Sequence, residues 1–275
     1  MKKQRSGFAL FATTFFVSLG VMLLVMGLIL SVTVQTDEES SQPSSDLSTQ
    51  NYHPSAEDGF RILIIAEDGE EKHFALLTMD PAAVEVSLVS LPGELTATVD
   101  KREGTLLSHE QYAGGGETVR AAEALLGIKV DRWLRIRRQG AVNMIDALGG
   151  MEWEFSEPLE TDRLSIPVGR HLLDGETVVT LMEEDDRRLP ETVKMAASLV
   201  GQRLTEQLLN KGDWFFQVLT ANTDGNISQF DYQSNKKLLR WYLTHANRKL
   251  TGHTVTGERQ GGKLLLTDEE KALLG

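Results

Sequence analysis

Short apolar segments, separated by charged residues or glycine, dominate the chain after residue 58. Residues 61–65 and 74–79 are apolar runs, and residues 84–91 alternate in part between apolar and polar side chains. Runs of this length with breaks of this kind are typical of β-strands. Between the second and third runs, Pro81 suits the second position of a tight turn. The pattern predicts three successive strands, the last two forming an antiparallel hairpin.

Longer segments follow in which apolar residues recur at helical spacing. Residues 116–126 and 138–148 are two of them, and each stops at a glycine. Thr267 and Glu270 form a capping-box signature that starts a short terminal helix. Further helices are predicted at 190–209 and 235–250, and further strands at 133–137 and 151–155.

Strands and helices interleave along the chain, which favours a central mixed β-sheet flanked by helices. The chain has 275 residues, of which 41% are hydrophobic, enough for a substantial core. We expect one α/β domain over residues 59–275.

The N-terminal part has a different pattern. Residues 8–34 are 27 consecutive uncharged residues, and a helix of that length covers about 40 Å, more than the ~30 Å hydrocarbon core of a bilayer. Basic residues precede this segment and acids follow it, so the positive-inside rule places residues 1–7 in the cytoplasm. We expect an uncleaved transmembrane anchor, then a polar tether over 35–58, then a domain outside the cell membrane.

Charge and cysteine content exclude several classes of protein. The formal net charge is −12, and Lys2, Lys3 and Arg5 stand before every acid, so the remainder carries 25 basic against 40 acidic residues. A body with a net charge of −15 repels nucleic acid, so we expect no nucleic-acid partner. The absence of cysteine excludes disulfides, thiolate nucleophiles and zinc-thiolate sites.

Three sets of residues have side chains or backbone groups that could take part in catalysis or bind a ligand. Gly114, Gly115 and Gly116 precede a helix, but no phosphate-loop spacing follows, so we interpret them as a turn. Residues 108–110 (Ser-His-Glu) are predicted to form a surface loop, because adjacent residues do not assemble a catalytic triad. The acids at 183–186, Asp68 and residues 224–226 could each hold a hard cation, although the spacing shows no known site.

Several motifs taken together resemble the LytR-CpsA-Psr family. These motifs come after the N-terminal apolar segment and the tether. They occur in the order and spacing of the family and cover nearly the whole external domain. The motifs are 62–68 (Ile-Leu-Ile-Ile-Ala-Glu-Asp), 76–81 (Leu-Leu-Thr-Met-Asp-Pro), 89–92 (Val-Ser-Leu-Pro), 124–128 (Ala-Leu-Leu-Gly-Ile), 145–153 (Ile-Asp-Ala-Leu-Gly-Gly-Met-Glu-Trp) and 172–176 (Leu-Leu-Asp-Gly-Glu).

The resemblance implies an α/β fold that holds a polyprenyl chain in an apolar tunnel, with the pyrophosphate of the lipid at its mouth. Enzymes of the family transfer a glycopolymer from that carrier to peptidoglycan, assisted by Mg²⁺. Arginines would face the pyrophosphate and carboxylates would hold the cation.

The chain departs from the family where the site residues are expected. Asp68 matches the metal-side aspartate, but the next acid of the family falls on residues 72–73 (Lys-His). The family's Arg-Asp pair after the third strand falls on Gly93 and Glu94, so an arginine is replaced by glycine. His109 matches the histidine of the middle loop.

A second departure follows residues 172–176. The two arginines that the family places there fall on Glu183 and Asp185, and Arg188 is the one arginine of the next family motif that remains. Acids at these positions would repel a pyrophosphate. Charge at this segment is therefore inverted.

Three functions remain open. The first is a degenerate member that binds polyprenyl-linked or wall components, or regulates a partner such as an active family member. The second is a transferase, using Mg²⁺, with relocated basic residues. The third is an extracytoplasmic sensor or scaffold. Arg135 and Arg137 share a strand face and could form a basic patch, and the other candidates for relocated basic residues are Arg102, Arg120, Arg187 and Arg188.

Overall fold

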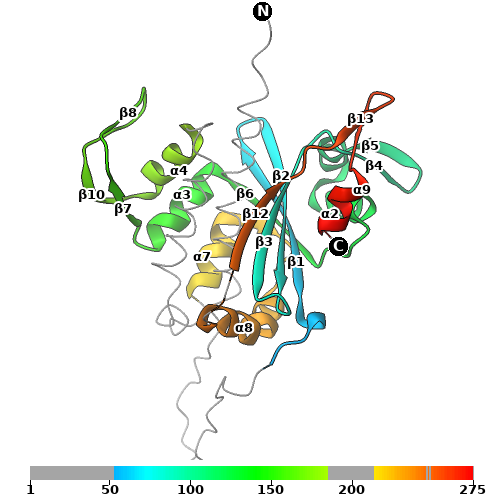
Figure 1. Ribbon diagram of the computed structural model, residues 1–275, viewed down its shortest axis with the longest axis horizontal. Coiled ribbons are helices and arrows are strands. Elements are labelled where there is room, and N and C mark those ends of the chain that lie inside the picture. The colour runs from blue at the N-terminus through cyan, green and yellow to red at the C-terminus, as the bar shows by residue number, and fades with distance from the viewer. Residues whose placement is uncertain (1–52, 185–213, 246, 248, 275) are drawn as a thin grey trace, which may run out of the picture.

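A six-stranded mixed sheet forms the centre of the molecule (Figure 1). The computed structural model describes residues 53–184, 214–245, 247 and 249–274. The strand order is β11-β6-β1-β2-β3-β12, with β1 parallel to β6, β3 parallel to β12 and the other neighbours antiparallel. The strands are β1 (Phe60–Asp68), β2 (Glu71–Asp80), β3 (Glu85–Leu91), β6 (Arg132–Arg137), β11 (Thr223–Gly225) and β12 (Lys249–Thr254). The predicted α/β class is confirmed.

Both faces of the sheet are buried, because alternate residues of each strand enter different cores. Along β1, Ile62 and Ile64 pack into one hydrophobic cluster, while Leu63 and Ile65 pack into another. Helices cover the first face (Figure 1): α3 (Arg138–Ala147), α4 (Gly175–Glu184), α7 (Trp214–Asn222) and α8 (Gln229–Thr244).

The second face is covered by α2 (Leu106–Leu126) and by short elements near both of its ends (Figure 1). These are the hairpin of β4 (Thr96–Val99) and β5 (Arg102–Thr105), the hairpin of β13 (Glu258–Gln260) and β14 (Lys263–Leu265), and α9 (Asp268–Leu274). A separate arm leaves the first face, made of β7 (Met151–Phe155), β8 (Leu159–Glu160), β9 (Ser165–Ile166) and β10 (Gly169–Leu173).

Most predicted elements are confirmed, with two corrections. The predicted helix at 116–126 begins ten residues earlier, at Leu106, and carries a kink where Ala113 and Gly114 leave helical geometry. The helix predicted at 235–250 is wrong at both ends: α8 covers Gln229–Thr244, and Lys249–Thr254 forms edge strand β12. Backbone pairing of β12 with β3 overrides the helical spacing there. The predicted helix at 190–209 lies outside the described residues.

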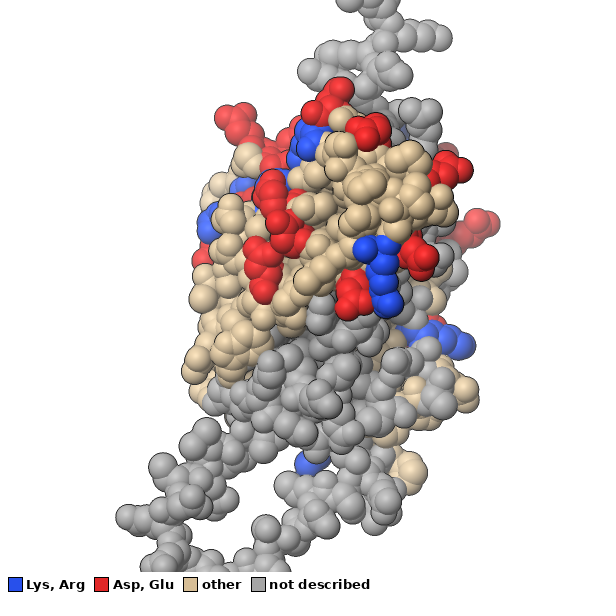
Figure 2. All heavy atoms as spheres, turned by 90° about the vertical axis from the view of Figure 1, so that its left-hand side faces the viewer, with Lys and Arg blue, Asp and Glu red and all other residues tan. Residues whose placement is uncertain are grey.

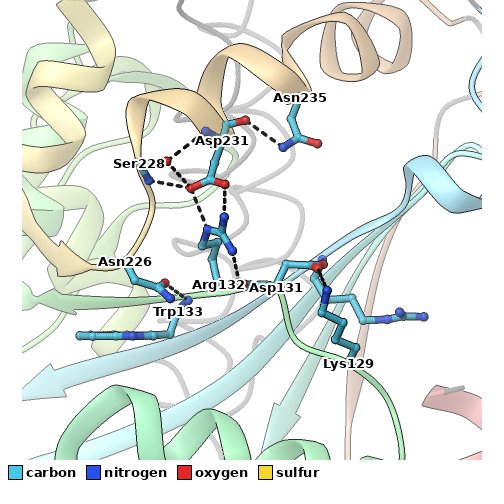
Figure 3. Close-up of polar contacts among 9 residues, drawn as sticks. Lys129, Asp131, Arg132, Trp133, Asn226, Ser228, Asp231 and Asn235 are labelled. Carbon is cyan, nitrogen blue, oxygen red and sulfur yellow. Dashed lines mark hydrogen bonds and ion pairs between the residues drawn. The ribbon is translucent and has the colours of Figure 1, made fainter.

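An ion pair fixes α8 against the sheet (Figure 3). Arg132 at the start of β6 donates two hydrogen bonds to Asp231, one of them from Nε at 2.7 Å. The same carboxylate caps α8 by accepting from the backbone N–H and the hydroxyl of Ser228. Burial alone would raise the pKa of Asp231, but the hydrogen bonds from Arg132 and Ser228 hold it below its usual value. This contact joins the start of strand β6 to the helix that covers this face of the sheet.

None of the helices in the described part of the chain is long and apolar enough to cross a membrane. The anchor predicted at 8–34 lies outside that part, so it stays a prediction.

The predicted capping box at the C-terminus is confirmed. Glu270 in α9 accepts hydrogen bonds from the backbone N–H groups of Thr256, Gly257 and Thr267, at 2.9 to 3.0 Å. Burial alone would raise the pKa of Glu270, but these donors lower it to about 2. The carboxylate therefore fastens the last helix to the loop that follows β12.

Replacing Glu270 with Gln should lower the free energy of unfolding at pH 7 by about 1–3 kcal/mol, the usual contribution of hydrogen bonds to a charged acceptor. Because folding lowers the pKa from 4.5 to about 2, the stabilisation is complete above the unfolded-state value and is lost as the pH falls through the folded-state value. Denaturation of both proteins at pH 7 and at about pH 2.5 measures this pH dependence.

Glu269→Gln is the matched control, because Glu269 lies in the same helical turn but is exposed. A stability loss for Glu270→Gln that is the same at both pH values, or that Glu269→Gln equals, would contradict this account of the C-terminal cap.

Candidate functional site

A row of alternating charges crosses the sheet where β1 ends. The strand register places Glu67 of β1 between Lys72 of β2 and Arg137 of β6. Glu67 Oε1 is 3.6 Å from Lys72 Nζ, and Glu67 Oε2 is 3.1 Å from Arg137 Nε. Arg137 continues the row, since its Nη2 is 3.1 Å from Asp224 of β11. Opposite charges on neighbouring strands stabilise such a row.

Helix α2 adds a buried carboxylate to this row. Glu110 is only 3% exposed, and it accepts hydrogen bonds from Lys72 and from Arg135 Nη2. The Nε of Arg135 lies 3.1 Å from Glu67 Oε1, although it is not aligned for a hydrogen bond. Glu67, Arg135, Glu110 and Lys72 thus form a closed ring of alternating charge. We call these four residues the charge ring.

The charge ring and its extension carry no net charge. Three cations, Lys72, Arg135 and Arg137, contact three carboxylates, Glu67, Glu110 and Asp224. Burying a carboxylate costs several kcal/mol unless cations compensate it, so Glu110 requires these partners. Arg135 and Arg137 do share one face, as the sequence predicts, but carboxylates hold both of them.

The other basic candidates lie apart from the charge ring. Arg120 contacts Asp100 and Glu117, with Nη1 3.1 Å from Glu117 Oε2. Arg102 lies over the exposed ring of Tyr112, with 3.5 Å between its Cζ and the ring centroid. Arg187 and Arg188 lie outside the described residues.

Residues 108–110 correct a sequence prediction, because they belong to α2 and are not a surface loop. His109 is fully buried, with Nδ1 3.3 Å from Glu117 Oε1 and Nε2 3.4 Å from the carbonyl oxygen of Ala97. Thr105 caps the helix here by accepting from the backbone N–H of Ser108. The sequence does not predict this first part of the helix, because the segment before residue 114 lacks apolar residues at helical spacing and three glycines follow it.

Asp68, Gly93 and Glu94 lie where strands β1 and β3 end, at the same end of the sheet. Asp68 is the last residue of β1 and is half-buried. Gly93 follows β3, where its carbonyl oxygen accepts from the backbone N–H of Leu107 at 3.0 Å. Glu94 is exposed. Burial lowers the pKa of His73 to about 4, and the negative charge of Glu94 partly opposes this shift. Glu183 lies in the last turn of α4, and Asp185 is outside the described residues.

The described residues do not assemble a Mg²⁺ site from protein side chains alone. Among them, no three Asp, Glu or His side chains converge as metal ligands. The lysine at 72 places an ammonium group between two of the carboxylates at this end of the sheet, Glu67 and Glu110. A resident cation there opposes binding of a second one.

The motif at 172–176 holds two helices together. Asp174 caps α4 by accepting from the backbone N–H of Thr177 at 2.8 Å, and these contacts lower the pKa of Asp174. The carboxylate oxygens of Glu176 accept hydrogen bonds from Nη1 and Nη2 of Arg138, both at 2.8 Å. These hydrogen bonds lower the pKa of Glu176. Gly175 lies against α3, where a Cβ would overlap the carbonyl oxygen of Val142. The motif is explained by packing.

Two other motifs also have structural roles. Asp146, in the motif at 145–153, accepts from the backbone N–H of Gly175 at 2.6 Å and so joins α3 to α4. Gly150 has φ +72° and faces the carbonyl oxygen of Leu173, where a side chain would collide. Gly127, in the motif at 124–128, ends α2 in the left-handed conformation, φ +68°.

The face with α3, α4 and the arm is acidic (Figure 2). Acidic side chains outnumber basic ones over its described part, as Figure 2 shows. The exposed acids of the arm are Glu152, Glu154, Glu157, Glu160 and Asp162, against Arg163 and Arg170. The described part of this face therefore carries more negative than positive charge, which disfavours binding of a polyanion.

Comparison with known proteins identifies relatives of the chain. Residues 23–255 match the LytR_cpsA_psr family. The polyisoprenyl-teichoic acid–peptidoglycan teichoic acid transferase TagU of Bacillus subtilis is 22% identical over 218 residues, 73% of this chain and 71% of the relative.

Two solved structures have a similar fold. The crystal structure of B. subtilis TagV has a TM-score of 0.56 and 16% identity, covering 78% of this chain and 94% of that chain. A transcriptional regulator from Enterococcus faecalis has a TM-score of 0.56 and 18% identity, covering 78% and 84%. At these identities the fold is the shared property.

Two glycine substitutions test the structural reading of the motif at 172–176. Gly175→Ala should lower the free energy of unfolding by about 1–3 kcal/mol, because the new methyl group overlaps the α3 backbone. Gly116→Ala is the matched control: a Cβ there meets no atom within 4 Å, so alanine should stabilise α2 by up to about 1 kcal/mol. Equilibrium denaturation measures both, and a neutral Gly175→Ala would show that the helices do not need this close approach.

Proposed function

The chain belongs to the LytR_cpsA_psr family, and from this premise we propose that it is a membrane-anchored, extracytoplasmic member that binds wall components, or regulates a partner in wall assembly, without transferring polymer. In this proposal residues 8–34 anchor it, with the N-terminus in the cytoplasm. Its ligand class is a polyprenyl-linked glycopolymer or peptidoglycan, and its partner class includes an active family member.

One observation carries the proposal: the cations at the end of the sheet are held by carboxylates of the protein itself. Lys72, Arg135 and Arg137 contact Glu67, Glu110 and Asp224, which leaves this cluster with no net charge. Transfer from a pyrophosphate carrier needs positive groups that stabilise charge developing on the leaving phosphate. Cations already neutralised by the protein supply little of that stabilisation.

The departures at candidate positions support the same conclusion. A glycine stands at position 93, acids stand at 183 and 185, and a lysine stands at 72, where the family's second metal-side acid falls. Each change removes a positive charge where the phosphate is expected to bind, or adds one where the metal ion is expected to bind.

The choice of ligand follows from the relatives. The name of the B. subtilis relative gives a polyisoprenyl-linked teichoic acid as donor and peptidoglycan as acceptor. Since the motifs that pack α3 against α4 are retained, we infer that this chain keeps the scaffold on which such a ligand is recognised. An active transferase and an unrelated sensor or scaffold are the other outcomes of the test.

A transfer assay tests the proposal. The full-length protein in detergent, with Mg²⁺ and a polyprenyl-pyrophosphate-linked glycopolymer, should release no phosphate and transfer no polymer above the background without protein. The B. subtilis relative in the same assay shows that the substrate is competent. Magnesium-dependent turnover that Asp68→Ala abolishes would refute the loss of transfer.

Binding without turnover is measured in parallel. The protein is mixed with vesicles that contain the polyprenyl-linked substrate or lack it, and then treated with protease. Its external domain should be cleaved more slowly when the substrate is present. No difference, together with no turnover, would favour the sensor or scaffold.

A further inference from the structure

Glu110 is bound in the way that a ligand oxyanion would be bound. Its Oε2 accepts from Lys72 Nζ, and its Oε1 accepts from Arg135 Nη2 at 2.5 Å. An ammonium group and a guanidinium group on two oxygens of one anion is the arrangement by which proteins hold carboxylates and phosphates. Here the anion belongs to the chain, and its side chain is 2% exposed.

The two cations remain within reach of solvent. The side chain of Lys72 is 23% exposed and that of Arg135 is 18% exposed, whereas the side chain of Glu110 is 2% exposed. With the Glu110 charge removed, the ring of Lys72, Arg135 and Glu67 would hold two cations against one carboxylate. The excess of one positive charge would lie in a partly buried place, where it attracts anions more strongly than on the surface.

The backbone holds Glu110 in place independently of its charge. The first turn of α2 is attached to the loop after β3 by two bonds: Leu106 N–H donates to Leu95 at 2.9 Å, and Leu107 N–H donates to Gly93 at 3.0 Å. Thr105 caps the same turn. A shortened side chain at 110 should therefore leave the helix where it is and vacate the space between the two cations.

We propose that Lys72 and Arg135 form a binding site for a phosphate-type oxyanion, and that Glu110 occupies this site as an internal anion and closes it. This inference rests on the proposed function, because it concerns the same end of the sheet. It adds a specificity-determining residue: the identity of residue 110 decides whether phosphate enters.

Binding of inorganic pyrophosphate to the full-length protein in detergent tests the inference, with chelator present to exclude metal. Calorimetry and the shift of the thermal unfolding midpoint report binding. Glu110→Ala should bind pyrophosphate at least about tenfold more tightly than the wild type, since charge-assisted hydrogen bonds contribute that much or more. Vesicles containing polyprenyl pyrophosphate form a second arm, which separates a lipid headgroup from free pyrophosphate.

Three further variants complete the design. Glu110→Ser also shortens the side chain and removes its charge, so it should gain binding as well, and it carries the test if Glu110→Ala does not fold. Arg135→Met added to Glu110→Ala should abolish the gain. Glu103→Ala removes an exposed carboxylate that pairs with Lys263 at 2.5 Å, away from the ring, and should behave as wild type.

The inference is overturned if wild type and Glu110→Ala bind pyrophosphate equally, or if neither folded Glu110 variant gains binding. Its failure is distinguishable from failure of the proposed function. Turnover by the wild type refutes the latter whatever the Glu110 variants bind, while absence of any gain leaves the loss of transfer untouched.

Discussion

A carboxylate buried in a protein interior must be compensated by nearby cations, and the end of the central sheet is built around this constraint. Glu110 enters from α2, which covers one face of the sheet, and contacts Lys72 from β2 and Arg135 from β6. Glu67 on the strand between them closes the ring. Three strands and one helix are therefore held in register by charges that the chain itself supplies. Groups used in this way are not free to bind a ligand.

Under the proposed function, this chain keeps the scaffold of its family without the transfer chemistry. Motifs that pack helices, such as the glycine at 175 against α3 and the left-handed Gly127 at the end of α2, have clear physical roles in the fold. They are also the motifs by which the sequence resembles its family. The positions that the family resemblance assigns to a pyrophosphate, such as Gly93 and Glu183, are the ones that differ. A fold of this kind can hold its shape while its reactive groups change, so family membership and transfer activity are separate questions.

Much of the fold could be predicted from the sequence, because apolar spacing and glycine breaks are local signals. The hairpin of β2 and β3 and the cap at Thr267 are examples. Edge strand β12 could not be predicted, since its pairing with β3 joins distant segments. The charge ring is not predictable from the sequence for the same reason. Arg135 and Arg137 are predicted to share a strand face, but the sequence predicts a loop at Glu110. Only the register across three strands brings Glu67 and Lys72 to the arginines.

A double-mutant cycle between Glu110 and Arg135 tests most directly whether the protein's own carboxylates occupy its cations. The free energies of unfolding of the wild type, Glu110→Gln, Arg135→Met and the double variant give the coupling between the two side chains. The account predicts a favourable coupling of about 1.5 kcal/mol or more, as measured for close charge pairs elsewhere. Effects that add to within about 0.5 kcal/mol would show that the two groups are independent, and would contradict it.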